Sequence, residues 1–183
     1  DSDSFYQNID INDEEIKIFD EYTLGKSDYE DMEEFLEGNL ISFSDKMSID
    51  GNGFIFNCDL GEYEFSETYY FQSNEITSWV LEDGKSVENE DYDDYDTYKN
   101  LPLSAYLLKY ETSQESTAND LYDYLYKECT AKFSEADVNI DDLVNINDKT
   151  AVWNIDEQTQ FVVSKNLVGQ DSYEIFTGVS LEL

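Results

Sequence analysis

The apolar positions of the chain switch between a helical spacing and a strand-like alternation, and these switches mark the expected elements. Between residues 27 and 40 apolar side chains recur every three or four residues, which predicts an amphipathic helix. The apolar positions of this helix are Tyr29, Met32, Leu36 and Leu40. Ser27 followed by Glu30 matches a capping box, in which each side chain satisfies a backbone N–H group at a helix start. The pattern therefore predicts that the helix begins at Ser27.

Strand-like segments precede and follow this helix. Residues 16–19 form a pattern typical of a short strand. Asp50-Gly51-Asn52-Gly53 lies between two alternating segments and is a strong signal for a hairpin turn. Residues 48–59 partly resemble an EF-hand calcium loop, but their strand-like flanks favour the hairpin. Strands are expected at residues 46–50, 54–57, 63–65, 68–72 and 76–81.

The second half of the chain repeats the order strand, helix, strands. A strand is expected at 105–110, a helix at about 116–133, and three strands at 150–155, 159–164 and 173–181. The apolar stripe of the helix is formed by Ala118, Leu121, Tyr122, Leu125, Tyr126, Cys129 and Phe133. The fold class is therefore expected to be α+β, with antiparallel sheet or sheets and two main helices.

The domain organisation follows from the same order of elements. Residues 1–15 form a polar N-terminal arm, and residues 82–100 form an acidic linker or long loop. The segments 16–81 and 101–183 are the two α+β units. They are interpreted as two β-α-β-β-β units in tandem, or else as one domain with a single mixed sheet and two helices on one face.

Charge changes this picture most. The chain holds 44 acidic residues against 10 basic ones, a formal net charge of −34, and all ten cations are lysines. Aromatic residues make up 15% of the chain, which favours a packed core over disorder. Such acidity disfavours direct binding to nucleic acid or to anionic membranes and permits basic proteins and divalent cations as partners. No apolar run approaches the length needed for a transmembrane segment.

The residue types that are missing exclude several kinds of chemistry. The chain has no histidine and no arginine, so it has neither a Ser-His-Asp or Cys-His centre nor a bidentate guanidinium clamp. Imidazole ligands for zinc are absent, and two distant cysteines, Cys58 and Cys129, do not make a zinc site alone. Whether these cysteines pair is left open by their spacing. We therefore expect a protein that is not an enzyme and has no required cofactor.

Two acidic clusters are the candidate functional residues. The first is a partner-binding acidic face on the first helix, formed by Asp28, Glu30, Asp31, Glu33, Glu34 and Glu37. The second is a set of candidate calcium ligands in the acidic loop, Asp91, Asp93, Asp94 and Asp96. Carboxylate oxygens suit a hard cation such as Ca²⁺, although a solvated loop explains the same run. The loop cluster could also continue the acidic row of the helix.

A resemblance points to a location. Residues 106–110, the helix at 116–133 and residues 151–155 follow the order strand, helix, antiparallel strands. In this respect residues 105–183 look similar to small extracytoplasmic lipoprotein domains of Gram-positive anaerobic bacteria. The resemblance implies a binding or structural role in a secreted or surface-anchored protein. The polar start Asp-Ser-Asp-Ser, without an initiator Met, agrees with this expectation.

The alternative is a nucleic-acid mimic of the anti-restriction or anti-CRISPR type, acting in the cytoplasm. Carboxylates on a rigid surface would imitate the phosphates of a duplex and occupy the basic groove of a DNA-binding enzyme. The sequence resembles such inhibitors in its net charge and its aromatic-rich composition. If the protein has a partner, we expect an unidentified basic protein under either hypothesis.

Overall fold

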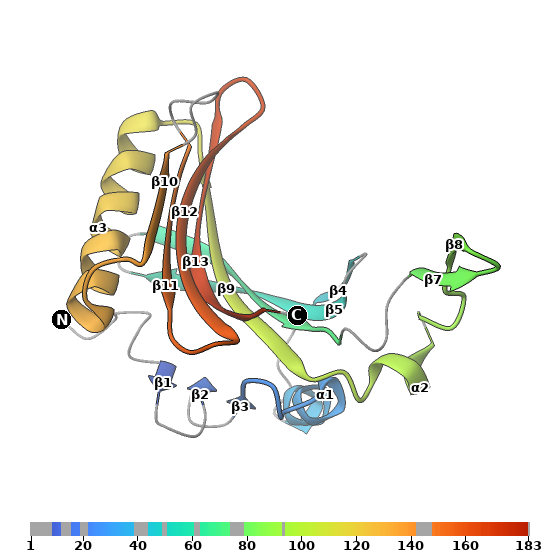
Figure 1. The fold of residues 1–183 in the computed structure, drawn as a ribbon. Helices are drawn as coiled ribbons and strands as arrows, with labels where there is room; N and C mark the ends of the chain where they lie inside the picture. The colour runs from blue at the N-terminus through green and yellow to red at the C-terminus, as the bar shows by residue number, and fades with distance from the viewer. Residues whose placement is uncertain are drawn as a thin grey trace. The chain divides into compact units, whose positions relative to one another are not determined.

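The structure is a computed structural model of the 183-residue chain, shown in Figure 1. It describes residues 9–11, 16–18, 22–38, 44–48, 51–60, 63–73, 79–92, 94–141 and 148–182. These residues form mostly antiparallel sheets together with three helices, so the expected α+β class is confirmed. The expected arm at residues 1–15 lies outside the described residues, apart from residues 9–11.

Three helices separate runs of strands along the described part of the chain. The helices are α1 (Tyr29–Gly38), α2 (Tyr95–Tyr98) and α3 (Glu115–Phe133). The strands of the first half are β1 (Ile9–Ile11), β2 (Ile16–Ile18), β3 (Tyr22–Thr23), β4 (Ser44–Ser48), β5 (Gly51–Leu60), β6 (Tyr63–Phe71), β7 (Trp79–Glu82) and β8 (Lys85–Glu88). Those of the second half are β9 (Leu103–Thr112), β10 (Val138–Asp141), β11 (Lys149–Asn154), β12 (Thr159–Val168) and β13 (Ser172–Leu181).

The described strands make three sheets. The largest has eight strands in the order β10-β11-β12-β13-β9-β6-β5-β4. Within it, β12 pairs with β13 from Thr159 opposite Leu181 to Val168 opposite Ser172. The order β1-β2-β3 forms a small second sheet, and β7 and β8 form the third.

Two compact units divide the chain, and each takes segments from both halves of the sequence. Unit 1 contains residues 57–67 and 107–182, and unit 2 contains residues 9–56 and 68–106. Strands β5, β6 and β9 therefore contribute residues to both units. The tandem arrangement of two β-α-β-β-β units stays a prediction.

In unit 1 the long helix α3 packs on β12 and β13, as Figure 1 shows. Its buried side chains are Ala118, Leu121, Tyr122, Leu125 and Cys129, which lie on the predicted stripe. Tyr126 lies 5.5 Å from the Trp153 ring of β11, and Phe133 lies 5.1 Å from Phe161 of β12. The helical spacing of the sequence thus identified the face that builds this core. The side chain of Cys58 lies outside those described.

In unit 2 the first helix buries aromatic side chains against β5 and β6. The Tyr29 ring stacks on Phe54 at 4.5 Å and meets Phe71 edge-on at 5.5 Å. Met32, one turn further on, is also buried. The predicted apolar positions of α1 are confirmed at these two residues, whereas the side chains of Leu36 and Leu40 lie outside those described.

The helix cap differs from the expected one by a single residue. The backbone N–H of Asp31 donates to Asp28 Oδ1 at 3.0 Å, and that of Asp28 donates to Asp31 Oδ2 at 3.3 Å. This reciprocal pair is the capping box, so the predicted Ser27–Glu30 box is wrong. The Ser27 hydroxyl instead accepts the N–H of Thr23 at 2.8 Å and closes the preceding turn. Asp is as good a cap as Ser, so spacing alone did not distinguish the two registers.

A substitution separates the two capping registers. Asp28→Ala removes the acceptor for the Asp31 N–H and is expected to lower the free energy of unfolding by about 1 kcal/mol. Glu30→Ala, which removes the partner in the predicted register, is expected to cost less than about 0.5 kcal/mol. Urea unfolding followed by circular dichroism measures both. A larger loss for Glu30→Ala than for Asp28→Ala would restore the predicted cap.

The expected hairpin exists, but its paired strands extend into the segment that was predicted to be the turn. Ser48 of β4 pairs with Gly51 of β5, so only residues 49 and 50 connect the strands, and both lie outside the described residues. Gly51 and Gly53 therefore belong to strand β5 and not to the turn. Gly53 has another reason to be glycine, since a Cβ there would overlap the carbonyl oxygen of Tyr69. The structure places a close backbone approach where the sequence indicated a bend.

The acidic segment 82–100 holds more structure than a linker. Strands β7 and β8 pair from Trp79 opposite Glu88 to Glu82 opposite Lys85, and α2 follows. Asp83 and Gly84, both at positive φ, make the two-residue turn between the strands. Strand β10 was also not predicted, because Val138 and Ile140 are exposed and their short run carries little signal.

Candidate acidic binding surface

Backbone hydrogen bonds hold the start of α1 against the segment that follows α2. The N–H of Tyr29 donates to the Leu101 carbonyl at 3.2 Å, and the N–H of Glu30 donates to the Lys99 carbonyl at 2.9 Å. Asp28 also forms an antiparallel bridge with Pro102. The first N–H groups of a helix have no partner within the helix, and these carbonyls supply one. The contacts bring the acidic first turn of α1 beside the end of the acidic segment.

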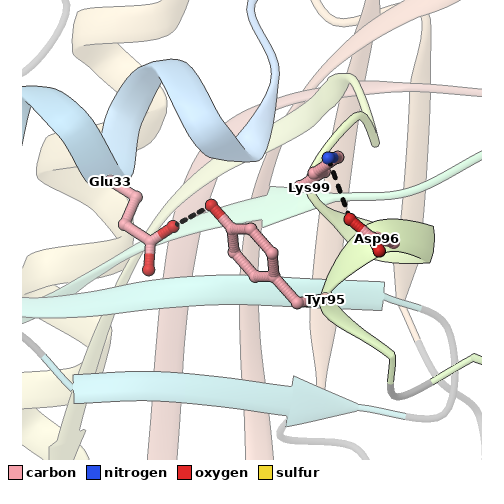
Figure 2. Close-up of polar contacts among 4 residues, drawn as sticks. All are labelled: Glu33, Tyr95, Asp96 and Lys99. Atoms are coloured by element: carbon pink, nitrogen blue, oxygen red, sulfur yellow. Dashed lines mark hydrogen bonds and ion pairs between the residues drawn. The ribbon is translucent and has the colours of Figure 1, made fainter.

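A side-chain contact joins the two acidic segments directly. The Tyr95 hydroxyl of α2 donates to Glu33 Oε2 of α1 at 2.7 Å, as Figure 2 shows. The Tyr95 ring meets Tyr98 edge-on at 5.4 Å, and Tyr98 in turn meets Tyr29 at 5.0 Å. This chain of rings leads from the exposed Tyr95 to the buried core of unit 2. The surface that carries Glu33 therefore rests on packed aromatic side chains.

The same contact changes the acidity of the phenol. The hydrogen bond to Glu33 raises the pKa of Tyr95 well above its usual range, and desolvation and the charges of Glu33 and Glu30 act in the same direction. A phenolate there would face carboxylates instead of donating to one. Because the pKa of Tyr95 is raised in the folded state, its hydrogen bond to Glu33 stabilises the fold fully below about pH 10. This stabilisation is lost as the pH rises above that value.

An alkaline titration tests this arrangement. The difference between the ultraviolet titrations of the wild type and Tyr95→Phe is expected to show a phenol that ionises above the ordinary tyrosine pKa of about 10. Glu33→Gln is expected to lower that pKa, because it removes the charge that favours the neutral phenol. The Tyr95→Phe variant is expected to lose less than about 1 kcal/mol of stability, since the contact is exposed. A difference titration centred on 10 would contradict the contact.

One lysine lies within this acidic region. Lys99 Nζ pairs with Asp96 Oδ1 at 2.9 Å (Figure 2) and lies 6.0 Å from the centre of the Tyr95 ring. The hydrogen bond and the charge of Asp96 raise the pKa of Lys99, and Glu30 adds to the effect. Lys99 is thus already engaged by an acidic neighbour, and it leaves the other carboxylates of the region in excess.

The residues predicted for the partner-binding face have different environments. Asp31 and Glu34 are exposed, while Asp28, Glu30 and Glu33 are half-buried. Asp28 and Asp31 also cap the helix. Glu37 lies in α1, but its side chain is outside those described. We call Glu30, Glu33, Glu34, Asp94 and Asp96 the acidic surface. The sequence did not single out Tyr95, although a tyrosine repeatedly flanked by aspartates was a visible signal for it.

The candidate calcium ligands are spread along α2 and the preceding turn. Asp91, Asp94 and Asp96 are exposed, and Asp93 lies outside the described residues. The carbonyl of Asp94 accepts the N–H groups of Thr97 and Tyr98 at the start of α2, while Asp96 pairs with Lys99. Within the part of the chain that the structure describes, no three His, Cys, Asp or Glu side chains gather as a metal site.

Unit 1 contains a buried cation that the sequence did not reveal. Lys165 lies on β12 on the same face as Phe161 and Val163, is almost completely buried, and donates to Asn119 Oδ1 of α3. Burial lowers the pKa of Lys165, and the neighbouring Lys149 acts in the same direction. This hydrogen bond joins α3 to the sheet, so we assign Lys165 a structural role.

Comparison with protein-family models, with curated proteins and with solved structures finds no match. None of the described helices is long and apolar enough to cross a membrane.

Proposed function

We propose that this protein is a non-enzymatic binding protein that recognises a basic partner protein through the acidic surface of unit 2. The observation that carries the proposal is the contact between Glu33 and Tyr95, which lie 62 positions apart in the chain and belong to two different acidic segments. It makes one surface out of charges that are far apart in the sequence. Carboxylates held in this way attract a cationic surface and increase its rate of association.

The exposure and the charge of this surface support a protein partner. Glu34, Asp94 and Asp96 are exposed, and the described cation among them, Lys99, is paired with Asp96. A net charge of −34 repels nucleic acid and anionic lipid and leaves a basic protein as the favourable macromolecular partner. The aromatic support beneath α1 limits the rearrangement that binding would need.

We place this activity outside the cytoplasm, in a secreted or surface-anchored protein of the lipoprotein-like kind. The order of β9, α3 and the antiparallel strands β10 to β13 supports the setting, because it repeats the order on which the resemblance rests. The support is one of element order. The lack of histidine and arginine agrees with a binding role.

The second candidate is the nucleic-acid mimic, and one observation favours it. Tyr95, which lies between Asp94 and Asp96 in the chain, donates to Glu33 of α1, and this contact supports the idea that the two aspartates continue the acidic row of the helix. Such a row is the feature that a basic DNA-binding groove would recognise. The two candidates share the surface and differ in the partner and in the compartment.

A capture experiment tests the proposal and separates the two candidates. The immobilised protein is incubated with bacterial envelope and cytosolic fractions at low and at high salt, and bound proteins are identified by mass spectrometry. We expect a basic envelope protein that is released as salt rises, because screening weakens the charge attraction. A cytosolic DNA-processing enzyme that duplex DNA displaces would establish the mimic instead. No salt-sensitive partner in either fraction would contradict both.

A further inference from the structure

The hairpin of β7 and β8 presents apolar side chains to solvent. Trp79 is 52% exposed and Leu81 is 78% exposed. The two residues are two positions apart in β7, so their side chains lie on the same face of the strand. On the other face Val80 pairs with Val87. A tryptophan and a leucine side by side at this exposure are the composition of a binding site centre more than of an ordinary surface.

The architecture of the hairpin points the same way. Within the described residues, β7 and β8 form a sheet of two strands, each four residues long. An isolated hairpin of two strands is marginally stable in water and gains stability when its apolar face is covered. Asp83 and Gly84 give it a turn that favours the hairpin shape before any partner arrives.

Charge decides which occupant fits. Residues 79–96 contain eight acidic residues and one lysine, so the apolar face lies in a strongly acidic segment. Glu82, Asp83 and Glu88 are exposed within the hairpin itself. A second copy of this chain would bring a net charge of −34 towards another −34, and an anionic membrane would also be repelled. A partner with an apolar surface bordered by cations would complement both the apolar side chains of the hairpin and the carboxylates around them.

We infer that the β7–β8 hairpin is a docking element for a cationic amphipathic segment of a partner protein. Trp79 and Leu81 cover the apolar side of that segment, while Glu88, which lies opposite Trp79 on the same face, and Asp83 in the turn pair with its lysines or arginines. The inference rests on the proposed function and adds the partner's chemistry, namely an apolar stripe beside basic residues. Trp79 is the expected anchor, because buried tryptophans contribute strongly to interfaces.

Tryptophan fluorescence reads the docking directly. The chain has two tryptophans, and Trp153 is buried, so an emission change on binding reports Trp79. The probe is a short peptide of alternating lysine and valine, and the control peptide alternates glutamate and valine. We expect the lysine peptide to shift the emission of Trp79 to the blue and to protect it from quenching by acrylamide. The glutamate peptide is expected to do neither. Trp79→Phe is expected to abolish the shift.

Affinity for the labelled lysine peptide tests the apolar part of the inference. Trp79→Ser/Leu81→Ser is expected to weaken binding by at least about tenfold, as loss of an aromatic anchor does. The matched control is Val138→Ser/Ile140→Ser, which removes two exposed apolar residues from β10 of unit 1 and is expected to leave the affinity within about twofold. Equal effects of the two variants would show that the peptide binds by charge alone and would overturn the inference.

Two further outcomes would also overturn it. An emission shift that follows protein concentration without peptide would show self-association, and a shift with phosphatidylcholine vesicles but not with peptide would show membrane binding. The proposed function fails separately. If the hairpin variant keeps a captured partner that a charge-reversed acidic surface loses, the docking inference is wrong and the proposed function stands. If no basic partner exists while the peptide still docks on Trp79, the proposed function is wrong.

Discussion

Replacing Trp153 by alanine is expected to lower the free energy of unfolding by about 3–5 kcal/mol. The Trp153 side chain is 1% exposed and lies between β11 and the helix α3, where its ring meets Tyr126. Its Nε1 also donates to the carbonyl of Ser134, just past the end of α3, at 3.0 Å. Alanine would leave a cavity and an acceptor without its donor, so the two losses add.

Urea unfolding followed by far-ultraviolet circular dichroism measures this loss without depending on tryptophan emission. Leu125→Ala, on the helix face that meets the same sheet, is expected to cost about 2–5 kcal/mol. Ile140→Ala is the control, because its side chain is exposed and its removal is expected to cost less than about 0.5 kcal/mol. A loss below about 1 kcal/mol for Trp153→Ala would show that α3 does not cover this face of the sheet.

Replacing Gly53 by alanine is expected to lower the free energy of unfolding by about 1–3 kcal/mol. The added Cβ would overlap the carbonyl oxygen of Tyr69, which is backbone and has no rotamer to change. Either β5 moves away from β6 at this point, or the carbonyl turns out of its place. Phe54, which stacks on Tyr29 of α1, is the next residue in the strand. The strain would therefore reach the aromatic support of the acidic surface.

A second glycine provides the control. Gly84 has a φ of +76° and nothing within 4 Å of an added Cβ, so Gly84→Ala tests backbone strain without a clash. It is expected to cost about 1 kcal/mol and to leave the near-ultraviolet circular dichroism of the aromatic core unchanged. Gly53→Ala is expected to change that spectrum. A Gly53→Ala variant as stable as the wild type would show that β5 and β6 do not approach closely at this position.

The sequence predicted those parts of the fold in which one side of an element is apolar. The stripe from Ala118 to Cys129 gave the face of α3, because burial at helical spacing leaves a clear periodic signal. The prediction of the helix cap was wrong by one residue, because Ser27 and Asp28 are equally good capping residues. The prediction that Gly53 belongs to the turn of the β4–β5 hairpin was wrong. A glycine is needed there because the backbone of Tyr69 approaches closely, and since Tyr69 lies on another strand this contact leaves no signal in the local sequence.

The acidic surface was predictable as a composition but not as a place. Local sequence showed that Glu33 and Asp96 belong to acidic runs, yet only the fold shows that the runs meet. Their meeting depends on the backbone bonds from Tyr29 and Glu30 to the segment after α2 and on the phenol of Tyr95. The sequence predicted a strand at residues 76–81, but only the structure shows that Trp79 lies in a hairpin and is exposed.

Binding of the captured basic partner through the acidic surface is tested by comparing two charge-reversed variants. Glu30→Lys/Glu34→Lys reverses two charges of the acidic surface, while Asp120→Lys/Glu135→Lys makes the same change of net charge at exposed positions in unit 1. We expect the first variant to weaken binding at least about tenfold and to flatten its dependence on salt, because charge attraction at that surface is lost. The second variant is predicted to bind nearly as well as the wild type. Equal losses in the two variants would show that overall charge, and not the surface joined by Glu33 and Tyr95, attracts the partner.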